Sequence, residues 1–169
     1  TCILFGDGAG AVVLEASEEA GILSSHLHAD GQHEKLLRVP YGVSQGSNQL
    51  EQERAFIEMK GNEVFKMAVN TLGRIVDETL SANQMEKSDI DWLVPHQANL
   101  RIMRGTTKKL GVAEDKLIVT IDRHANTSAA SIPLAVADAH GAGKFSSGDL
   151  ILLEGIGGGL TWGACLLRW

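Results

Sequence analysis

Three short apolar runs constrain the fold most, because each one ends abruptly in a polar or glycine-rich segment. They cover residues 91–95, 117–121 and 150–153. Runs of this length favour buried strands over helices. Residues 99–110 and 127–140, which lie between the runs, are typical of helices. Alternating strands and helices predict an α/β domain, with helices packed against a mixed sheet.

Further elements extend this pattern on both sides. Apolar residues recur at helical spacing over 62–80, which predicts a long helix. Residues 11–15 and 21–28 favour two strands that form a hairpin. The polar, glycine-containing stretch 29–54 predicts a long excursion over the surface.

The C-terminal segment predicts a second hairpin. Residues 161–167 form a second apolar strand after the run at 150–153, and the connection contains residues 155–159, four of which are glycine. This hairpin is expected to close the sheet.

Composition excludes several classes of protein. A chain of 169 residues fits one domain, and we treat 1–169 as a single unit. The net charge of −6, with 15 Lys and Arg, argues against a general nucleic-acid binder. The sequence contains no apolar stretch long enough to cross a membrane. Cys2 and Cys165 fit neither a disulfide framework nor a metal site, which favours the cytoplasm. The chain opens without Met, as expected of a part of a longer protein.

Polar residues directly after the three runs are the candidates for chemistry. In α/β sheets, sites gather beyond the carboxyl ends of the strands. The first run leads to His96, the second to Asn126 and the third to the glycines 155–159. Imidazole, carboxamide and backbone N–H groups can together stabilise a developing oxyanion. On residue type alone, hydrogen-bonded structural roles for His96 and Asn126 are favoured, and the glycines equally fit an ordinary hairpin turn.

Other motifs point to no chemistry. Residues 6–11 approximate a dinucleotide fingerprint, but an apolar strand is expected after them, so we predict a glycine-rich turn. His26 and His28 share a strand face, yet no third metal ligand follows at a recognisable spacing, and we expect no metal. The two cysteines lie in apolar strand context, where cysteine is usually inert.

Four basic residues lie on the two predicted helices nearest His96. They are Lys66, Arg101, Lys108 and Lys109. In an acidic chain they fit either a local patch for an acidic partner or an ordinary solvated helix face.

Five segments together resemble one enzyme family. They are FGDGAGA (5–11), GNEVFK (61–66), DWLVPHQANLRI (91–102), DRHANTSAASIP (122–133) and EGIGGGLTWG (154–163). In this order they resemble beta-ketoacyl-ACP synthase III, over the C-terminal half of such enzymes. The resemblance implies a thiolase-like fold with a mixed five-stranded sheet packed by helices. It also implies that an N-terminal domain with the nucleophilic cysteine is absent.

The resemblance assigns roles to single residues. It implies that His96 and Asn126 are catalytic and that the backbone of Gly158 contributes to an oxyanion hole. Other residues would line a tunnel for CoA or phosphopantetheine: Gly61, Asn62, Phe65, Asn99 and Arg101. The basic residues Lys66, Arg101, Lys108 and Lys109 would face acyl carrier protein (ACP).

The implied reaction is a decarboxylating condensation of a short acyl-CoA with malonyl-ACP, at the start of fatty acid synthesis. It needs no metal or redox cofactor, because CoA thioester and phosphopantetheine-ACP are substrates. The implied partners are ACP, acyl-CoA, the N-terminal half and a second subunit of a homodimer, with no nucleic acid or membrane. The chain alone is expected to be inactive. The alternatives are a non-catalytic CoA- or ACP-binding module and a chalcone-synthase-like or HMG-CoA-synthase-like enzyme.

Overall fold

A computed structural model describes residues 3–19, 21–42 and 56–169. Its main sheet has four strands in the order β1-β6-β5-β4. The strands are β1 (Ile22–Ala29), β4 (Trp92–Pro95), β5 (Leu150–Gly157) and β6 (Thr161–Arg168). β4 runs parallel to β5, and the other two pairs are antiparallel. The predicted mixed sheet and C-terminal hairpin are therefore confirmed.

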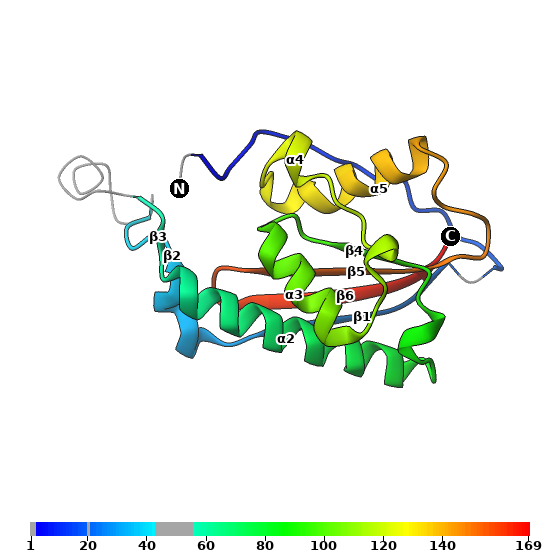
Figure 1. The fold of residues 1–169 in the computed structure, drawn as a ribbon, viewed down its shortest axis with the longest axis horizontal. Helices are drawn as coiled ribbons and strands as arrows, with labels where there is room; N and C mark the ends of the chain where they lie inside the picture. Colours follow the sequence, from blue (N-terminus) through cyan, green and yellow to red (C-terminus); the bar gives the residue numbers. More distant parts are fainter. Residues whose placement is uncertain (1–2, 20, 43–55) are drawn as a thin grey trace.

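Helices cover both faces of this sheet (Figure 1). α2 (Gly61–Ala82) and α3 (Leu100–Leu110) lie on one face, where they bury one core cluster with the even-numbered side chains of β5. α5 (Ser131–Gly141) packs on the other face against Val94 and Ile151. The short α4 (Ile121–His124) precedes α5. The helices predicted over 62–80, 99–110 and 127–140 are present, although the last begins with a 3-10 turn, η5 (Ser128–Ala130).

The ends of α3 follow from local chemistry. Asn99 caps the N-terminus, because its Oδ1 accepts a hydrogen bond from the Arg101 N–H at 2.8 Å. Gly111 ends the helix with φ of 71°, a left-handed conformation that glycine adopts without steric cost. Asn99 also fixes where the loop after β4 ends, and that loop carries His96.

A small second layer lies beside the N-terminus of α2. It consists of η1 (Gly31–Leu36), β2 (Leu37–Arg38) and β3 (Glu58–Met59), and the two strands pair antiparallel. The surface excursion predicted for 29–54 therefore contains ordered elements up to residue 38, and residues 43–54 lie outside the described part. Two further 3-10 turns, η3 (Lys87–Asp89) and η4 (Glu114–Lys116), connect the larger elements.

Three predictions for individual segments are wrong. Residues 11–15 form no strand in the described structure, and Val12, Val13 and Leu14 are exposed, so the predicted hairpin with 21–28 is absent. No turn is present at the glycines of 6–10. Residues 117–121 contribute one bridge, from Leu117 to Leu93, and the described main sheet has four strands where five were expected.

The N-terminal segment runs along α4 and α5 (Figure 1). The Asn126 N–H donates to the Leu4 carbonyl at 3.0 Å, and the Gly6 N–H donates to the Asn126 carbonyl at 3.0 Å. Glycine is required for this close approach, because a Cβ on Gly10 would lie 2.5 Å from the ring of Pro133. Segment 3–10 therefore supports the loop that carries Asn126.

Within the residues described, none of the helices combines the length and the apolarity that a bilayer span requires.

Candidate active site

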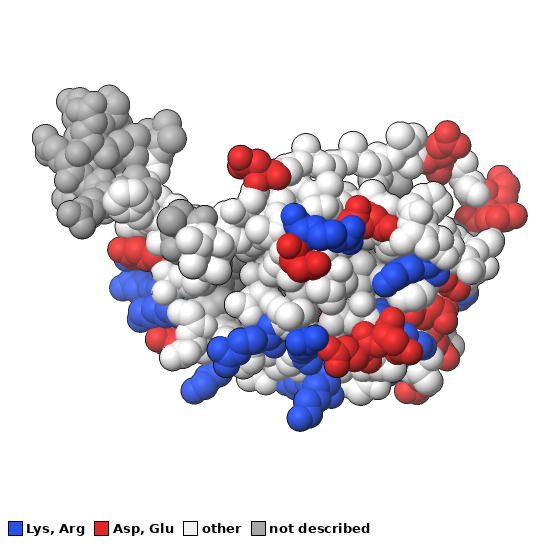
Figure 2. Space-filling view, turned by 45° about the horizontal axis from the view of Figure 1, so that its top comes forward, with Lys and Arg blue, Asp and Glu red and all other residues white. Residues whose placement is uncertain are grey.

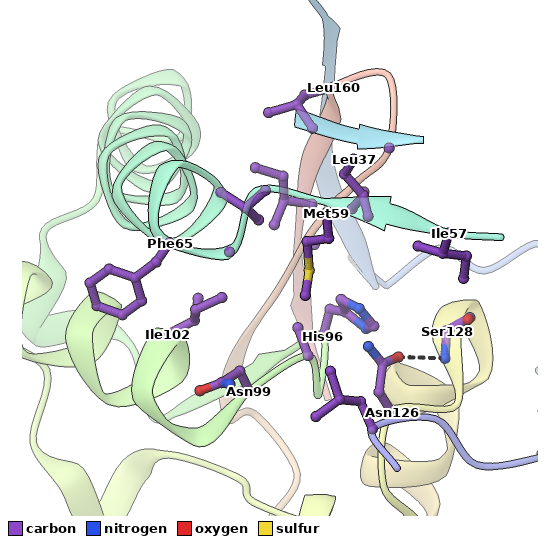
Figure 3. A pocket seen from close by; sticks show the side chains of 18 of the residues that line it. Leu37, Ile57, Met59, Phe65, His96, Asn99, Ile102, Asn126, Ser128 and Leu160 are labelled. Carbon is purple, nitrogen blue, oxygen red and sulfur yellow. Dashed lines mark hydrogen bonds between the residues drawn. The ribbon is translucent and has the colours of Figure 1, made fainter. Parts of the chain in front are cut away.

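One cavity of about 830 Å³ opens where the ends of β4 and β5 meet the N-termini of α2 and α3 (Figure 3). It brings together eight of the predicted site residues: Gly61, Asn62, Phe65, His96, Asn99, Arg101, Asn126 and Gly158. Residues far apart in the sequence therefore line one space. This geometry is compatible with their predicted roles.

His96 extends into this cavity from the end of β4. Its backbone N–H donates to the Glu154 carbonyl on β5 at 2.7 Å, which continues the strand pairing by one residue. The ring Nδ1 lies 2.6 Å from the Ser131 hydroxyl. Burial lowers the pKa of His96 below its ordinary value, and a hydrogen bond with the Ser128 backbone opposes this shift in part. His96 is therefore neutral at physiological pH, as a hydrogen-bonding imidazole in this cavity should be.

Asn126 approaches the same space from the other side of the sheet. Its Oδ1 accepts a hydrogen bond from the Ser128 N–H at 2.9 Å. The amide nitrogen is on the opposite side of the carboxamide and points toward His96 (Figure 3). The oxygen is occupied, and among the described residues no hydrogen bond to the nitrogen is present, so Asn126 presents a donor to the cavity.

The C-terminal end of β5, which extends to Gly157, and the turn after it form another wall. Gly155, Gly157 and Gly158 line the cavity, and a Cβ on Gly155 would lie 3.7 Å from the Cβ of His96. A Cβ on Gly158 would lie 3.0 Å from the Leu37 carbonyl oxygen. Glycine thus lets the main chain of this turn approach both the cavity and β2. This segment therefore serves both as the predicted hairpin connection and as a wall of the cavity.

The predicted tunnel residues lie at the N-termini of α2 and α3. The guanidinium carbon of Arg101 is 5.7 Å from the ring centroid of Phe65, which is a cation–π distance. Both side chains are at the cavity and partly face solvent. They could hold an elongated ligand with an anionic group at its outer end.

The other three basic residues lie outside the described cavity lining. Lys66, Lys108 and Lys109 are exposed on the outer surfaces of α2 and α3, and the Lys109 Nζ donates to the Asn70 Oδ1 at 2.7 Å. Figure 2 shows Lys and Arg side chains gathered along one side of this face. Lys66 follows Phe65 of the cavity lining, whereas Lys108 and Lys109 lie in the last turn of α3, at the end of that helix away from the cavity.

Sequence analysis missed several residues that line or support the cavity. Leu37, Ile57 and Met59 line it from the small second layer (Figure 3). Leu37 falls in the stretch 29–54 that was predicted to run over the surface, and no element was predicted for residues 55–60. Ser131 and Gln97 were missed as well, and their contacts depend on tertiary packing.

Glu154 is a buried acid directly beneath the site. It is 1% exposed, neither carboxyl oxygen has a hydrogen-bond partner among the described residues, and burial raises its pKa to about 8. The carboxyl group is therefore protonated at neutral pH.

His26 and His28 contact a helix. Both approach the Glu78 carboxylate on α2, at 3.2 and 2.9 Å, and the hydrogen bond from His28 is the main cause that lowers the pKa of Glu78. Among the described residues, no group of three or more His, Cys, Asp or Glu side chains has a metal-binding arrangement.

Comparisons with known proteins agree on one family. The family model described as 3-oxoacyl-[acyl-carrier-protein] synthase III C terminal matches residues 80–169, more than half of the chain. A second model, 3-oxoacyl-[acyl-carrier-protein] synthase III, matches residues 1–31. The two models together cover both ends of the chain.

Curated relatives are highly similar over the whole chain. A beta-ketoacyl-[acyl-carrier-protein] synthase III of Thioalkalivibrio sulfidiphilus is 61% identical over 168 residues, which are 99% of this chain and 52% of the relative. The protein of that name from Alkalilimnicola ehrlichii is 58% identical over 100% of this chain and 52% of its own length. The chain thus spans about half the length of the curated relatives it matches.

Solved structures show the same fold. The 3-oxoacyl-[acyl-carrier-protein] synthase III of Aquifex aeolicus superimposes with a TM-score of 0.90 at 42% identity, over 100% of this chain and 51% of that one. The Thermus thermophilus synthase III gives 0.83 at 36% identity, over 100% and 53%. The predicted thiolase-like α/β fold is confirmed. With a family model that matches more than half of its length, this chain belongs to the 3-oxoacyl-ACP synthase III family.

Proposed function

We propose that this chain supplies the histidine and asparagine of a 3-oxoacyl-ACP synthase III, which condenses a short acyl-CoA with malonyl-ACP at the start of fatty acid synthesis. The observation that carries the proposal is the arrangement of His96 and Asn126. Two hydrogen-bonding side chains from different loops point into one cavity, beside a glycine turn.

In the proposed reaction, a cysteine from the part of the enzyme outside this chain first takes the acyl group from acyl-CoA, and CoA leaves as the thiol. Malonyl-ACP then loses CO₂, and the electron pair of the broken C–C bond forms an enolate. Its carbon attacks the acyl thioester, the new C–C bond forms, and the cysteine thiolate leaves. None of these three steps needs a metal or redox cofactor.

His96 and Asn126 would act on the decarboxylation step. Neutral imidazole and carboxamide can each donate a hydrogen bond to the thioester oxygen as enolate charge develops. A partly buried site strengthens these bonds, because water does not compete with them there. The backbone N–H of Gly158 would stabilise the tetrahedral oxyanion of the acyl transfer.

The outer part of the cavity suits the substrate carriers. Gly61, Asn62, Phe65, Asn99 and Arg101 would line the path of the pantetheine arm. Lys66, Arg101, Lys108 and Lys109 would attract ACP, the acidic partner. We further propose that the full protein is a cytoplasmic homodimer.

The test uses a fused protein, in which this chain replaces the matching residues of the Thioalkalivibrio sulfidiphilus relative. We expect it to condense acetyl-CoA with malonyl-ACP, and this chain alone to be inactive. His96→Ala and Asn126→Ala should each reduce kcat on the order of a hundredfold.

Other outcomes would change the assignment. Condensation by this chain without the remaining half would show that the nucleophile lies within it. A folded fused protein that binds CoA or ACP but condenses nothing would instead favour the non-catalytic binding module.

A further inference from the structure

Gln97, the residue after His96, joins two loops through one buried side chain. It is 0% exposed. Its Nε2 donates to the carbonyl oxygens of Pro95 at 2.8 Å and Ile118 at 3.2 Å, and its Oε1 accepts from the Thr120 N–H at 2.9 Å. The carboxamide thus uses both N–H groups and its oxygen. It ties the end of β4 to the stretch that leads through α4 to Asn126.

Ser131 makes a second link from the start of α5. It is 1% exposed, and its hydroxyl accepts a hydrogen bond from the Gln97 backbone N–H at 3.1 Å. The same oxygen lies 2.6 Å from the Nδ1 of His96. One hydroxyl therefore fixes both the ring of His96 and the main chain beside it.

We infer that Gln97 and Ser131 are positioning residues, which together set the placement of the His96 ring relative to Asn126. The catalytic purpose of this placement rests on the proposed function. Neither residue belongs to the described cavity lining, so both act through His96 and the loop of Asn126. The bonds from Gln97 reach both loops, whereas the bond from Ser131 reaches the ring itself.

The physical basis is the steep dependence of catalysis on geometry. A displacement of about 1 Å in a reacting or hydrogen-bonding group can cost on the order of a hundredfold in rate. A histidine on a loop after a strand has rotational freedom, which neighbouring hydrogen bonds must remove. Buried and fully bonded side chains suit this task because their own rotamers are fixed.

The test compares Ser131→Ala and Gln97→Met in the fused protein. Methionine has about the length of glutamine but makes none of its three hydrogen bonds. We expect kcat to fall about tenfold to a hundredfold with little change in either KM, since substrate contacts remain. In a His96→Ala background the same substitutions should cause almost no further loss, because the residue they position is gone.

Thr79→Ala is the matched control. Thr79 is equally buried, and its hydroxyl donates to the Ile75 carbonyl at 2.7 Å, but it lies on α2 away from the cavity. It should leave kcat unchanged. Equal losses of kcat in Thr79→Ala and Ser131→Ala would overturn the inference and indicate general destabilisation. The same conclusion would follow if the substitutions lowered kcat as much in the His96→Ala background as in the unsubstituted protein.

A crystal structure of the Ser131→Ala variant of the fused protein separates this inference from the proposed function. If the unsubstituted fused protein is folded but inactive, the proposed function fails, and the structure still decides the positioning role. A His96 ring that turns away from its wild-type position supports the inference. A ring and loop that stay in place refute it.

Discussion

The carboxamide of Asn126 has its two ends in different surroundings. Its oxygen accepts the Ser128 N–H at 2.9 Å, and its nitrogen faces the cavity. Only the nitrogen can donate to a substrate oxygen. This asymmetry makes it possible to remove the donor while the local hydrogen bond stays in place.

Asn126→Asp performs that separation. The carboxylate keeps an acceptor for the Ser128 N–H but presents a negative oxygen where the enolate charge would develop. We expect kcat of the fused protein to fall on the order of a hundredfold or more, with an unchanged melting temperature. Steady-state kinetics and thermal unfolding check this together. An active Asp variant would exclude Asn126 as a donor.

Glu154 makes folding depend on pH. Its pKa is about 8 in the folded chain and has an ordinary value of 4.5. Between these values the unfolded chain is ionised and the folded chain is protonated at this site. The folded state therefore loses stability as pH rises through this window, by about 1.4 kcal/mol per pH unit from this group.

Glu154→Gln should remove that slope. We expect the free energy of unfolding of the variant to fall less steeply between pH 5 and pH 8 than that of the unsubstituted chain, measured by urea unfolding in this window. Glu63→Gln, at an exposed position on α2, should leave the slope unchanged. Parallel curves for Glu154→Gln and the unsubstituted chain would show that the buried carboxyl ionises normally.

Among the elements, the sequence predicted best those whose formation depends on local features, such as periodicity and capping residues. Period and length were enough for α2, and Asn99 and Gly111 marked the ends of α3. Residues 11–15 have the composition of a strand, but a strand exists only where a neighbour pairs with it, and no described segment pairs there. The strand predicted over 117–121 is wrong for a similar reason. The chain makes one bridge to Leu93 and then enters α4, so no further residues pair.

The contact of segment 3–10 with α4 and α5 depends on glycine. A Cβ on Gly6 would overlap the main-chain carbonyl oxygen of His124, which has little room to move. Gly6→Ala should therefore lower the free energy of unfolding by about 1–3 kcal/mol, measured by urea unfolding. Gly141→Ala is the control, since a Cβ there meets nothing within 4 Å, and it should be neutral or slightly stabilising. Equal effects of the two substitutions would contradict the close contact.

At the scale of the whole molecule, the site could be predicted only where its residues directly follow an apolar run in the sequence. His96, Asn126 and the glycine segment follow three separate apolar runs, so the rule that sites lie beyond strand ends selected them as candidates, and they line one cavity. Gln97 and Ser131 could not be found in this way. Their roles depend on which carbonyl, N–H or ring they meet after folding, and residues 35 positions apart, such as His96 and Ser131, meet only through packing.

The charge distribution of the whole chain leads to the last prediction. The chain carries a net charge of −6, yet Lys66, Lys108 and Lys109 are exposed on α2 and α3, the helices whose N-termini border the cavity. A local basic surface attracts an acidic partner, while the acidic remainder of the protein repels that partner. Lys108→Glu with Lys109→Glu should therefore raise the KM for malonyl-ACP about tenfold or more, and should change the KM for acetyl-CoA little.

The control keeps the same change of net charge at a distance. Lys87 lies beyond the C-terminal end of α2, and Lys144 lies after α5, over the Trp92 ring. Lys87→Glu with Lys144→Glu should leave the KM for malonyl-ACP close to that of the unsubstituted fused protein. Added salt should weaken the effect of the Lys108→Glu and Lys109→Glu substitutions on KM, because salt screens the electrostatic interaction with ACP in the variant and in the unsubstituted fused protein alike. Equal effects of the two pairs would mean that net charge, and not the position of Lys108 and Lys109 on α3, governs the encounter with ACP.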